Sequence, residues 1–234
     1  LLYGGLKDVS TFYQHAMINH SYIEGAYRFV DGSMQVSLEL INVIRANGGT
    51  VLNNSEATRI IVENEKVQGV IINGEKRLES DFVISNMHPQ RTLEILDKNR
   101  SIKNAYISRI RSLENTYGIF TLYLVMKKKS TPYQNRNLYL HGVWYDKQLY
   151  PGRTTNCMIS MQASSEDSQY ASVISILTPM YMNELSAWKD TTPEHRGESY
   201  RSFKKEKTEQ LLRFIRSHGI DFSDNIEEIH TTTP

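Results

Sequence analysis

Histidine, cysteine and serine are the side chains of this sequence that could support nucleophilic or metal chemistry, but their spacing forms none of the usual motifs. The seven histidines are scattered, and His15 and His20 are five residues apart, which places them on different sides of a helix. The single cysteine, Cys157, excludes an internal disulfide and a four-cysteine zinc site. The sequence contains no HExxH and no GxSxG elbow. We therefore expect no metal site and assign no catalytic residue.

Glycine motifs that bind phosphate are absent as well. No two glycines are separated by a single residue, so the dinucleotide fingerprint GxGxxG does not occur, and there is no Gly-Lys-Ser/Thr of a P-loop. Lysine and arginine number 27 against 26 aspartates and glutamates, which gives a net charge of +1. A nucleic-acid partner normally requires a concentrated basic surface, so this balance argues against one.

Length and hydropathy set further limits. A chain of 234 residues is long enough for one large domain or two small ones. Its most apolar run, residues 118–126, has nine residues, whereas about 20 are needed to span a bilayer. The first residues show no signal peptide, so we expect a cytoplasmic protein. The missing initial methionine and the end at Pro234, directly after three threonines, predict that this is the middle of a longer polypeptide.

The first half of the chain predicts a helix followed by hairpins. Apolar residues recur at helical spacing after Ser33, and we expect Ser33 or Asp31 to cap a helix that ends at Gly48-Gly49. The Asn73-Gly74 pair predicts a hairpin turn. Extended segments are expected at residues 50–52, 58–62, 67–72 and 82–85. The last of these is predicted to be a buried strand, and a helix over 90–97 follows it.

The second half predicts a larger sheet with helices. Strands are expected at residues 118–126, 138–144, 157–162 and 171–177, and helices at 101–113, 181–188 and 194–218. The helix over 194–218 combines an apolar stripe with many charged residues, as a helix packed on one side does. This mixture of elements predicts an α+β fold, or an α/β fold with a mixed sheet.

An ordered series of short segments resembles the middle of a known enzyme family. The series comprises Tyr22–Gly25, Tyr27–Ser33, Gly48–Val51, Glu56–Ile60, Val67–Val70 and Phe82–Pro89. In order and spacing it resembles the phytoene desaturase, carotenoid isomerase and retinol saturase family of FAD-dependent oxidoreductases, which is related to the amine oxidases. Where this family usually has two glycines ahead of the helix, this chain has Gly32-Ser33, and serine suits the capping role.

The resemblance implies a flavin cofactor and a set of residues that contact it. In the family, the backbone beside Ala57-Thr58 runs along the adenine of FAD, where an amide and a carbonyl can pair with the adenine edge whatever the side chain. Ser85-Asn86 would lie at the carboxyl end of a strand, where α/β sheets place ligands. The implied cofactor-binding residues are Gly32, Ser33, Ala57, Thr58, Ser85 and Asn86.

The resemblance also implies how the chain is divided. Residues 31–88 would be part of a Rossmann-like FAD-binding domain, and residues 1–30 and 89–234 would be segments of the substrate domain. The whole chain would then be the central part of a two-domain enzyme. Ile229–Pro234 resembles the family's strand just before its last glycine-rich FAD segment. The resemblance implies FAD in the full-length protein. This chain lacks the helix N-terminus that would bind the pyrophosphate of FAD. We therefore expect that the chain alone does not retain FAD and is inactive.

Substrates of the family are long apolar polyenes or related lipids. The resemblance therefore implies desaturation, saturation or isomerisation of a carotenoid- or retinoid-type molecule, with the flavin performing the chemistry. On the predicted strands, Tyr123, Tyr139, Trp144 and Tyr145 are candidates for lining such a pocket. Strands favour aromatic residues in any case, so the alternative that they are ordinary core or edge residues stays open. Two alternatives stay open: an amine-oxidase-like flavoenzyme, and a non-catalytic module that binds an apolar ligand or a protein partner.

Two basic features would allow peripheral contact with a membrane. Lys127–Lys129 follow the long apolar strand, and the helix over 194–218 places Arg201, Lys204, Lys205 and Lys207 beside its apolar stripe. Either feature is equally compatible with a solvated strand end or with a helix docked on its own sheet.

Overall fold

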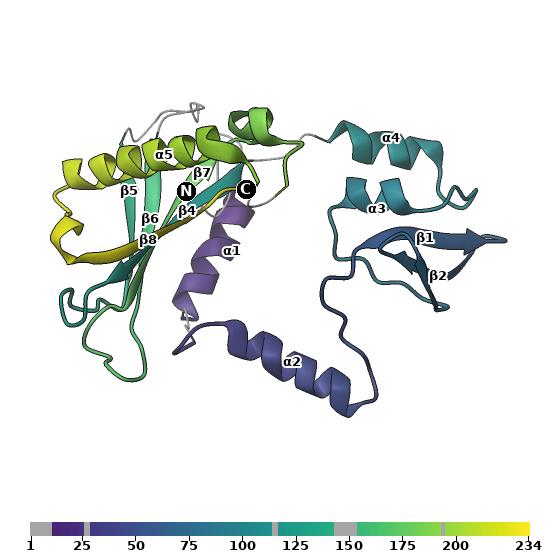
Figure 1. Ribbon diagram of the computed structural model, residues 1–234, viewed down its shortest axis with the longest axis horizontal. Helices are drawn as coiled ribbons and strands as arrows, with labels where there is room; N and C mark the ends of the chain where they lie inside the picture. The colour runs from purple at the N-terminus through teal and green to yellow at the C-terminus, as the bar shows by residue number, and fades with distance from the viewer. Residues whose placement is uncertain (1–10, 26–28, 114–116, 143–153, 193–194) are drawn as a thin grey trace. The chain divides into compact units, whose positions relative to one another are not determined.

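The computed structural model describes residues 11–25, 29–113, 117–142, 154–192 and 195–234, which fall into two compact units (Figure 1). The first unit comprises Leu1–Val36 and Thr116–Pro234 and the second Ser37–Asn115, counting the described residues within these ranges. The sequence placed the domain boundaries after residues 30 and 88. The division into flavin-binding and substrate-binding parts stays a prediction.

A five-stranded antiparallel sheet forms the centre of the first unit. In spatial order its strands are β5 (Asn137–His141), β6 (Asn156–Gln162), β7 (Val173–Met180), β4 (Gly118–Met126) and β8 (Ile226–Thr232). Strand β4 has the predicted bounds and pairs with β7 on one side and β8 on the other. Its unbroken run of aliphatic and aromatic residues suits a strand that is covered on both faces.

One face of this sheet packs against the long helix α5 (Gly197–Ser217), which Figure 1 shows lying along it. Side chains alternate along a strand, so every second residue of β4 points to this face, and Phe120, Leu122 and Leu124 are completely buried there. Helix α5 contributes Leu211 and Ile215, which are four residues apart and therefore on the same side of the helix. This layer is the main hydrophobic core of the unit.

Shorter helices complete the first unit: α1 (Phe12–Ile23) and the 3₁₀ helices η1 (Met182–Trp188) and η2 (Ser223–Asn225). Helix η1 is joined to α5 by an ion pair in which Lys207 donates to Glu184, whose side chains are 11 % and 9 % exposed. Next to this pair, the ring of Trp188 lies 5.0 Å from that of Phe203. The ion pair therefore sits in a nearly water-free contact between two helices.

The second unit contains a three-stranded antiparallel sheet of β1 (Ala57–Glu63), β2 (Lys66–Ile72) and β3 (Lys76–Glu79), with helices α3 (Pro89–Ile95) and α4 (Asn104–Ser112). Asn73 and Gly74 have φ of 53° and 79°, the left-handed values that the predicted hairpin turn requires. Its small core includes Ile60, Ile72 and Ile95.

Helix α2 (Met34–Ala46) starts and stops as predicted, since Gly48 follows it with φ of 79°. Asp31 does not cap it, because its carboxylate accepts a hydrogen bond from the Ser165 backbone N–H at 2.8 Å, which lowers the pKa of Asp31. No residue of α2 is buried among the described residues, and Val43 is 57 % exposed. None of the described helices has the length and hydrophobicity to cross a membrane.

The α+β class is confirmed, with both sheets antiparallel among the described strands where a mixed sheet had been an option. Two predicted strands are wrong, because residues 50–52 and 82–85 form none. Phe82 and Ile84 are 86 % and 98 % exposed, since no described strand lies beside them to share backbone hydrogen bonds and cover their side chains. The end of the strand predicted at 138–144 lies outside the described residues.

Candidate functional site

The face of the five-stranded sheet opposite α5 presents two cross-strand rows of side chains. Residues directly opposite one another in an antiparallel ladder point to the same face. The polar row is Asn137, Ser160, Ser175, Tyr123 and His230. The row beside it is Tyr139, Met158, Leu177, Thr121 and Thr232. We call these ten residues the second face.

Two of the aromatic residues predicted to line a pocket, Tyr123 and Tyr139, lie on this second face. The hydroxyl oxygen of Tyr139 is 3.0 Å from that of Tyr22 on α1. Trp144 and Tyr145 lie outside the described residues. Ser175 is 6 % exposed, and its hydroxyl has no hydrogen-bond partner among the described residues. A surface of aromatic, aliphatic and small hydroxyl side chains can bind an elongated apolar molecule.

The cysteine points the other way, into the core against α5. Cys157 is 2 % exposed, and burial raises the pKa of its thiol to about 12. The thiol is therefore protonated at neutral pH and is a poor nucleophile. Burial also lowers the pKa of His141 on β5, which favours its neutral form. Among the described residues, no three His, Cys, Asp or Glu side chains are grouped so as to hold a metal ion.

In the second unit, the predicted adenine-contacting residues begin the outer strand β1. Ala57 lies opposite Ile72 and Arg59 opposite Ile71, so Thr58 has no partner in the register and forms a bulge. A bulge leaves one residue unpaired and disrupts the ladder locally. Because β1 is the outermost strand on its side of the three-stranded sheet, no described strand pairs with its other edge.

The later part of this outer edge is already covered. The Asp97 backbone N–H donates to the Ile60 carbonyl at 3.0 Å, and the Asp97 carboxylate accepts from the Val62 N–H at 3.2 Å. Arg59 also donates to this carboxylate, at 2.6 Å, and its guanidinium holds the pKa of Asp97 below its usual value. The start of β1, at Thr58, has no such backbone contact from another described segment.

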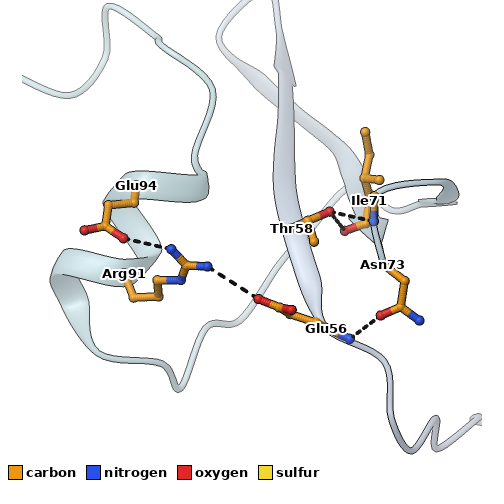
Figure 2. A network of polar contacts seen from close by, with 7 residues as sticks. Glu56, Thr58, Ile71, Asn73, Arg91 and Glu94 are labelled. Atoms are coloured by element: carbon orange, nitrogen blue, oxygen red, sulfur yellow. Dashed lines mark hydrogen bonds and ion pairs between the residues drawn. The ribbon is translucent and has the colours of Figure 1, made fainter. Parts of the chain in front are cut away.

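Figure 2 shows the contacts that hold the bulge in place. The Thr58 hydroxyl donates to the Ile71 carbonyl at 3.2 Å and accepts from the Gly74 N–H at 3.1 Å. The Asn73 N–H donates to the Glu56 carbonyl at 2.8 Å, and the Asn73 side-chain oxygen accepts from the Glu56 N–H at 2.8 Å. The hairpin turn therefore fixes the backbone just before and at the bulge, which the sequence did not indicate.

Replacing Asn73 by alanine is expected to destabilise the hairpin by about 2–3 kcal/mol. The change removes the hydrogen bonds of the Asn73 side chain with the Glu56 N–H and the Asn54 carbonyl, and it forces alanine into a left-handed backbone. Asn73→Gly is the matched control, because glycine loses these hydrogen bonds but accepts this φ, so we expect about 1 kcal/mol. Hydrogen exchange of the β1 and β2 amides measures the loss of hairpin stability in both variants. Equal loss of protection in the two variants would contradict the role given to the backbone conformation.

Ser85 and Asn86 lie before α3 in a segment that is neither helix nor strand, and so not at the end of a strand. The Ser85 hydroxyl lies 2.8 Å from the Thr92 hydroxyl and accepts a hydrogen bond from the Met87 N–H at 3.4 Å. The Ser85 hydroxyl therefore helps to hold the start of α3, and a cofactor contact of Ser85 stays a prediction. Asn86 is exposed, and its side chain has no hydrogen-bond partner among the described residues.

Gly32 and Ser33 precede α2 and belong to the first unit, so the six predicted cofactor residues are divided between the two units. Gly32 has φ of 96°, a conformation that favours glycine. A Cβ atom at Gly32 would meet no atom of the described residues within 4 Å.

Comparison with known proteins finds relatives with redox activities in their names. The chain is 29 % identical over 111 residues to 4,4'-diapophytoene desaturase (4,4'-diapolycopene-forming) of Methylomonas sp, covering 47 % of this chain and 21 % of that protein. It is 20 % identical to all-trans-retinol 13,14-reductase of Rattus norvegicus, covering 99 % of this chain and 42 % of the relative. The chain thus spans less than half the length of either relative. No family model matches it.

Among solved structures, an oxidoreductase from Methanosarcina mazei has the same fold over 83 % of this chain and 40 % of its own, with a TM-score of 0.50 and 19 % identity. This likeness concerns the fold alone. The sequence relatives confirm the predicted resemblance: the chain is similar to the family of phytoene desaturases and retinol saturases.

Proposed function

We propose that the full-length protein containing this chain is an FAD-dependent oxidoreductase that acts on an apolar, polyene-like substrate. The main support is the similarity along 99 % of the chain to a protein named as a retinol reductase. A second relative is named as a desaturase. Because one name describes reduction and the other desaturation, the proposal leaves the direction of the reaction open.

In this proposal the two units contribute different functions. The bulged edge of β1 at Ala57-Thr58 fits the adenine of FAD, since an edge backbone can pair with it whatever the side chains. Asn86 offers a side-chain amide that no described residue occupies. Tyr123 and Tyr139 on the second face bind the apolar substrate and exclude water from it. When bound, FAD supplies the acceptance or donation of two electrons.

An amine-oxidase-like flavoenzyme is a second possibility under the same fold, and a non-catalytic binding module is a third. Both would use the second face as a ligand surface, the first for an amine and the second without redox chemistry. For the main proposal the partner is a small apolar molecule, for the second possibility an amine, and for the third an apolar ligand or a protein. In all three cases we place the protein in the cytoplasm and expect no nucleic-acid partner.

Gel filtration after incubation with FAD tests the cofactor part of this proposal. The complete polypeptide is expected to retain stoichiometric FAD. The present chain is expected to release it, because it has no GxGxxG segment to bind the pyrophosphate at a helix N-terminus. Stoichiometric FAD on the present chain would contradict the proposed division of the site. A folded complete polypeptide without any FAD would contradict the flavin function itself.

A further inference from the structure

A groove of about 410 Å³ runs between α5 and the outer strand β8 of the first unit. Its β8 side is formed by Ile229 and Thr231, which lie opposite Leu124 and Leu122 in the ladder. Those partners belong to the core under α5, so the groove opens on the α5 side of the sheet. It is therefore separate from the second face, where the substrate is proposed to bind.

The groove is cationic at one end and apolar at the other. Arg201, Lys204 and Lys205 lie within about one turn of α5 and line one end. Lys204 donates to the Thr231 carbonyl at 3.0 Å, which holds its ammonium group at the β8 rim. Leu212, about two turns further along α5, and Ile229, which is 45 % exposed, form the apolar end.

The positive charges at this end are only weakly neutralised. Lys205 is exposed and has no ion-pair partner among the described residues. Arg201 pairs with Glu198 at 3.2 Å, but the two side chains are 72 % and 80 % exposed, so the pair is weak. Glu209, the acidic residue of the lining, comes later on α5 and lies 3.8 Å from Arg213. The basic end thus keeps an excess of positive charge.

We propose that this groove binds the acidic headgroup of an anionic phospholipid at a membrane surface. The headgroup lies against Arg201, Lys204 and Lys205, and the first acyl carbons lie against Leu212 and Ile229. An acidic peptide fits less well, because its charges repeat along its length whereas the groove has cations at one end and Glu209 further along. The inference is independent of the flavin function, since no predicted FAD residue lines the groove.

Co-sedimentation of the chain with phosphatidylcholine vesicles, with and without phosphatidylserine, tests the proposal. We expect binding to the vesicles that contain phosphatidylserine, and loss of that binding at high salt because the interaction is electrostatic. The double variant Arg201→Gln/Lys205→Gln is expected to bind these vesicles about tenfold or more weakly. Both positions are exposed, so the change should leave the fold intact, which circular dichroism checks.

Lys128→Gln/Lys129→Gln is the matched control, because it removes the same charge from the exposed basic run after β4. It is expected to bind as the unaltered chain does. Three results would each overturn the proposal. The Arg201/Lys205 variant could bind the phosphatidylserine vesicles as tightly as the unaltered chain, or the unaltered chain could bind neutral vesicles equally well. The Lys128/Lys129 variant could also lose more binding than the Arg201/Lys205 variant. Displacement by inorganic phosphate at matched ionic strength would indicate a site for the free ion. Groove-dependent binding to polyglutamate without vesicle binding would indicate an acidic protein partner.

Discussion

Replacement of Lys207 by alanine is expected to lower the free energy of unfolding of the first unit by about 3–5 kcal/mol. The Lys207 ammonium pairs with Glu184 between α5 and η1, where the side chains are 11 % and 9 % exposed. Removing the cation leaves the Glu184 carboxylate buried without its partner, although it still accepts from the Tyr181 N–H at 3.0 Å. An uncompensated buried charge is among the most costly single changes in a folded protein.

Two further variants distinguish the effect of the unpaired Glu184 carboxylate from the simple loss of a lysine side chain. Lys205→Ala removes an exposed lysine from the same helix and should change the stability by no more than about 0.5 kcal/mol. The double variant Lys207→Met/Glu184→Leu leaves neither charge behind, so it should recover most of the loss. Urea unfolding followed by tryptophan fluorescence, to which Trp188 on η1 contributes, measures the stability of all three variants. A loss of unfolding free energy in Lys207→Ala as small as that in Lys205→Ala would contradict the cost given to the unpaired Glu184 carboxylate.

Leu122→Ala is expected to destabilise the first unit by about 2–5 kcal/mol, because it opens a cavity where the surroundings can relax only partly. Leu122 is completely buried, and it lies between Ile176 of β7 and Thr231 of β8 in the centre of the sheet. Strands β7 and β8 flank Leu122, and α5 packs over it, so the neighbouring side chains cannot move far enough to fill the cavity.

The matched control is Ile84→Ala, an apolar residue that the sequence placed in a buried strand. Ile84 is 98 % exposed in the present chain, so its truncation should change stability by less than about 0.5 kcal/mol. Urea unfolding of both variants gives the comparison. A cost at Ile84 similar to that at Leu122 would mean that residues 82–85 are covered in solution, as the sequence predicted.

Local patterns predicted local structure well in this chain. The unbroken apolar run of β4, the Asn73-Gly74 turn and the amphipathic stripe of α5 each contain enough nearby information to determine their conformation. The sequence also predicted helix α2 correctly, although none of its residues is buried. Periodicity shows which side of a helix is apolar, but it does not show what covers that side.

The features that the sequence missed depend on contacts between distant residues. The bulge at Thr58 arises from a register shift against β2, and neither strand specifies that register by its own composition. The sequence also did not indicate that the Ser85 hydroxyl contacts the hydroxyl of Thr92, seven residues later. The pairing that joins Tyr123 and Ser175 across two strands likewise requires the sheet order. The second face therefore became visible only in the folded sheet.

The absorbance of bound flavin in the complete polypeptide, recorded under anaerobic conditions, tests the proposed flavin function most directly. Carotenoids, retinoids and simple amines are added in turn, to the oxidised protein and to the chemically reduced protein. We predict that a polyene changes the flavin between its oxidised and reduced forms in one of these two states, and that amines do not. A flavin that responds only to amines, or to none of these compounds in either state, would contradict the proposed activity on a polyene.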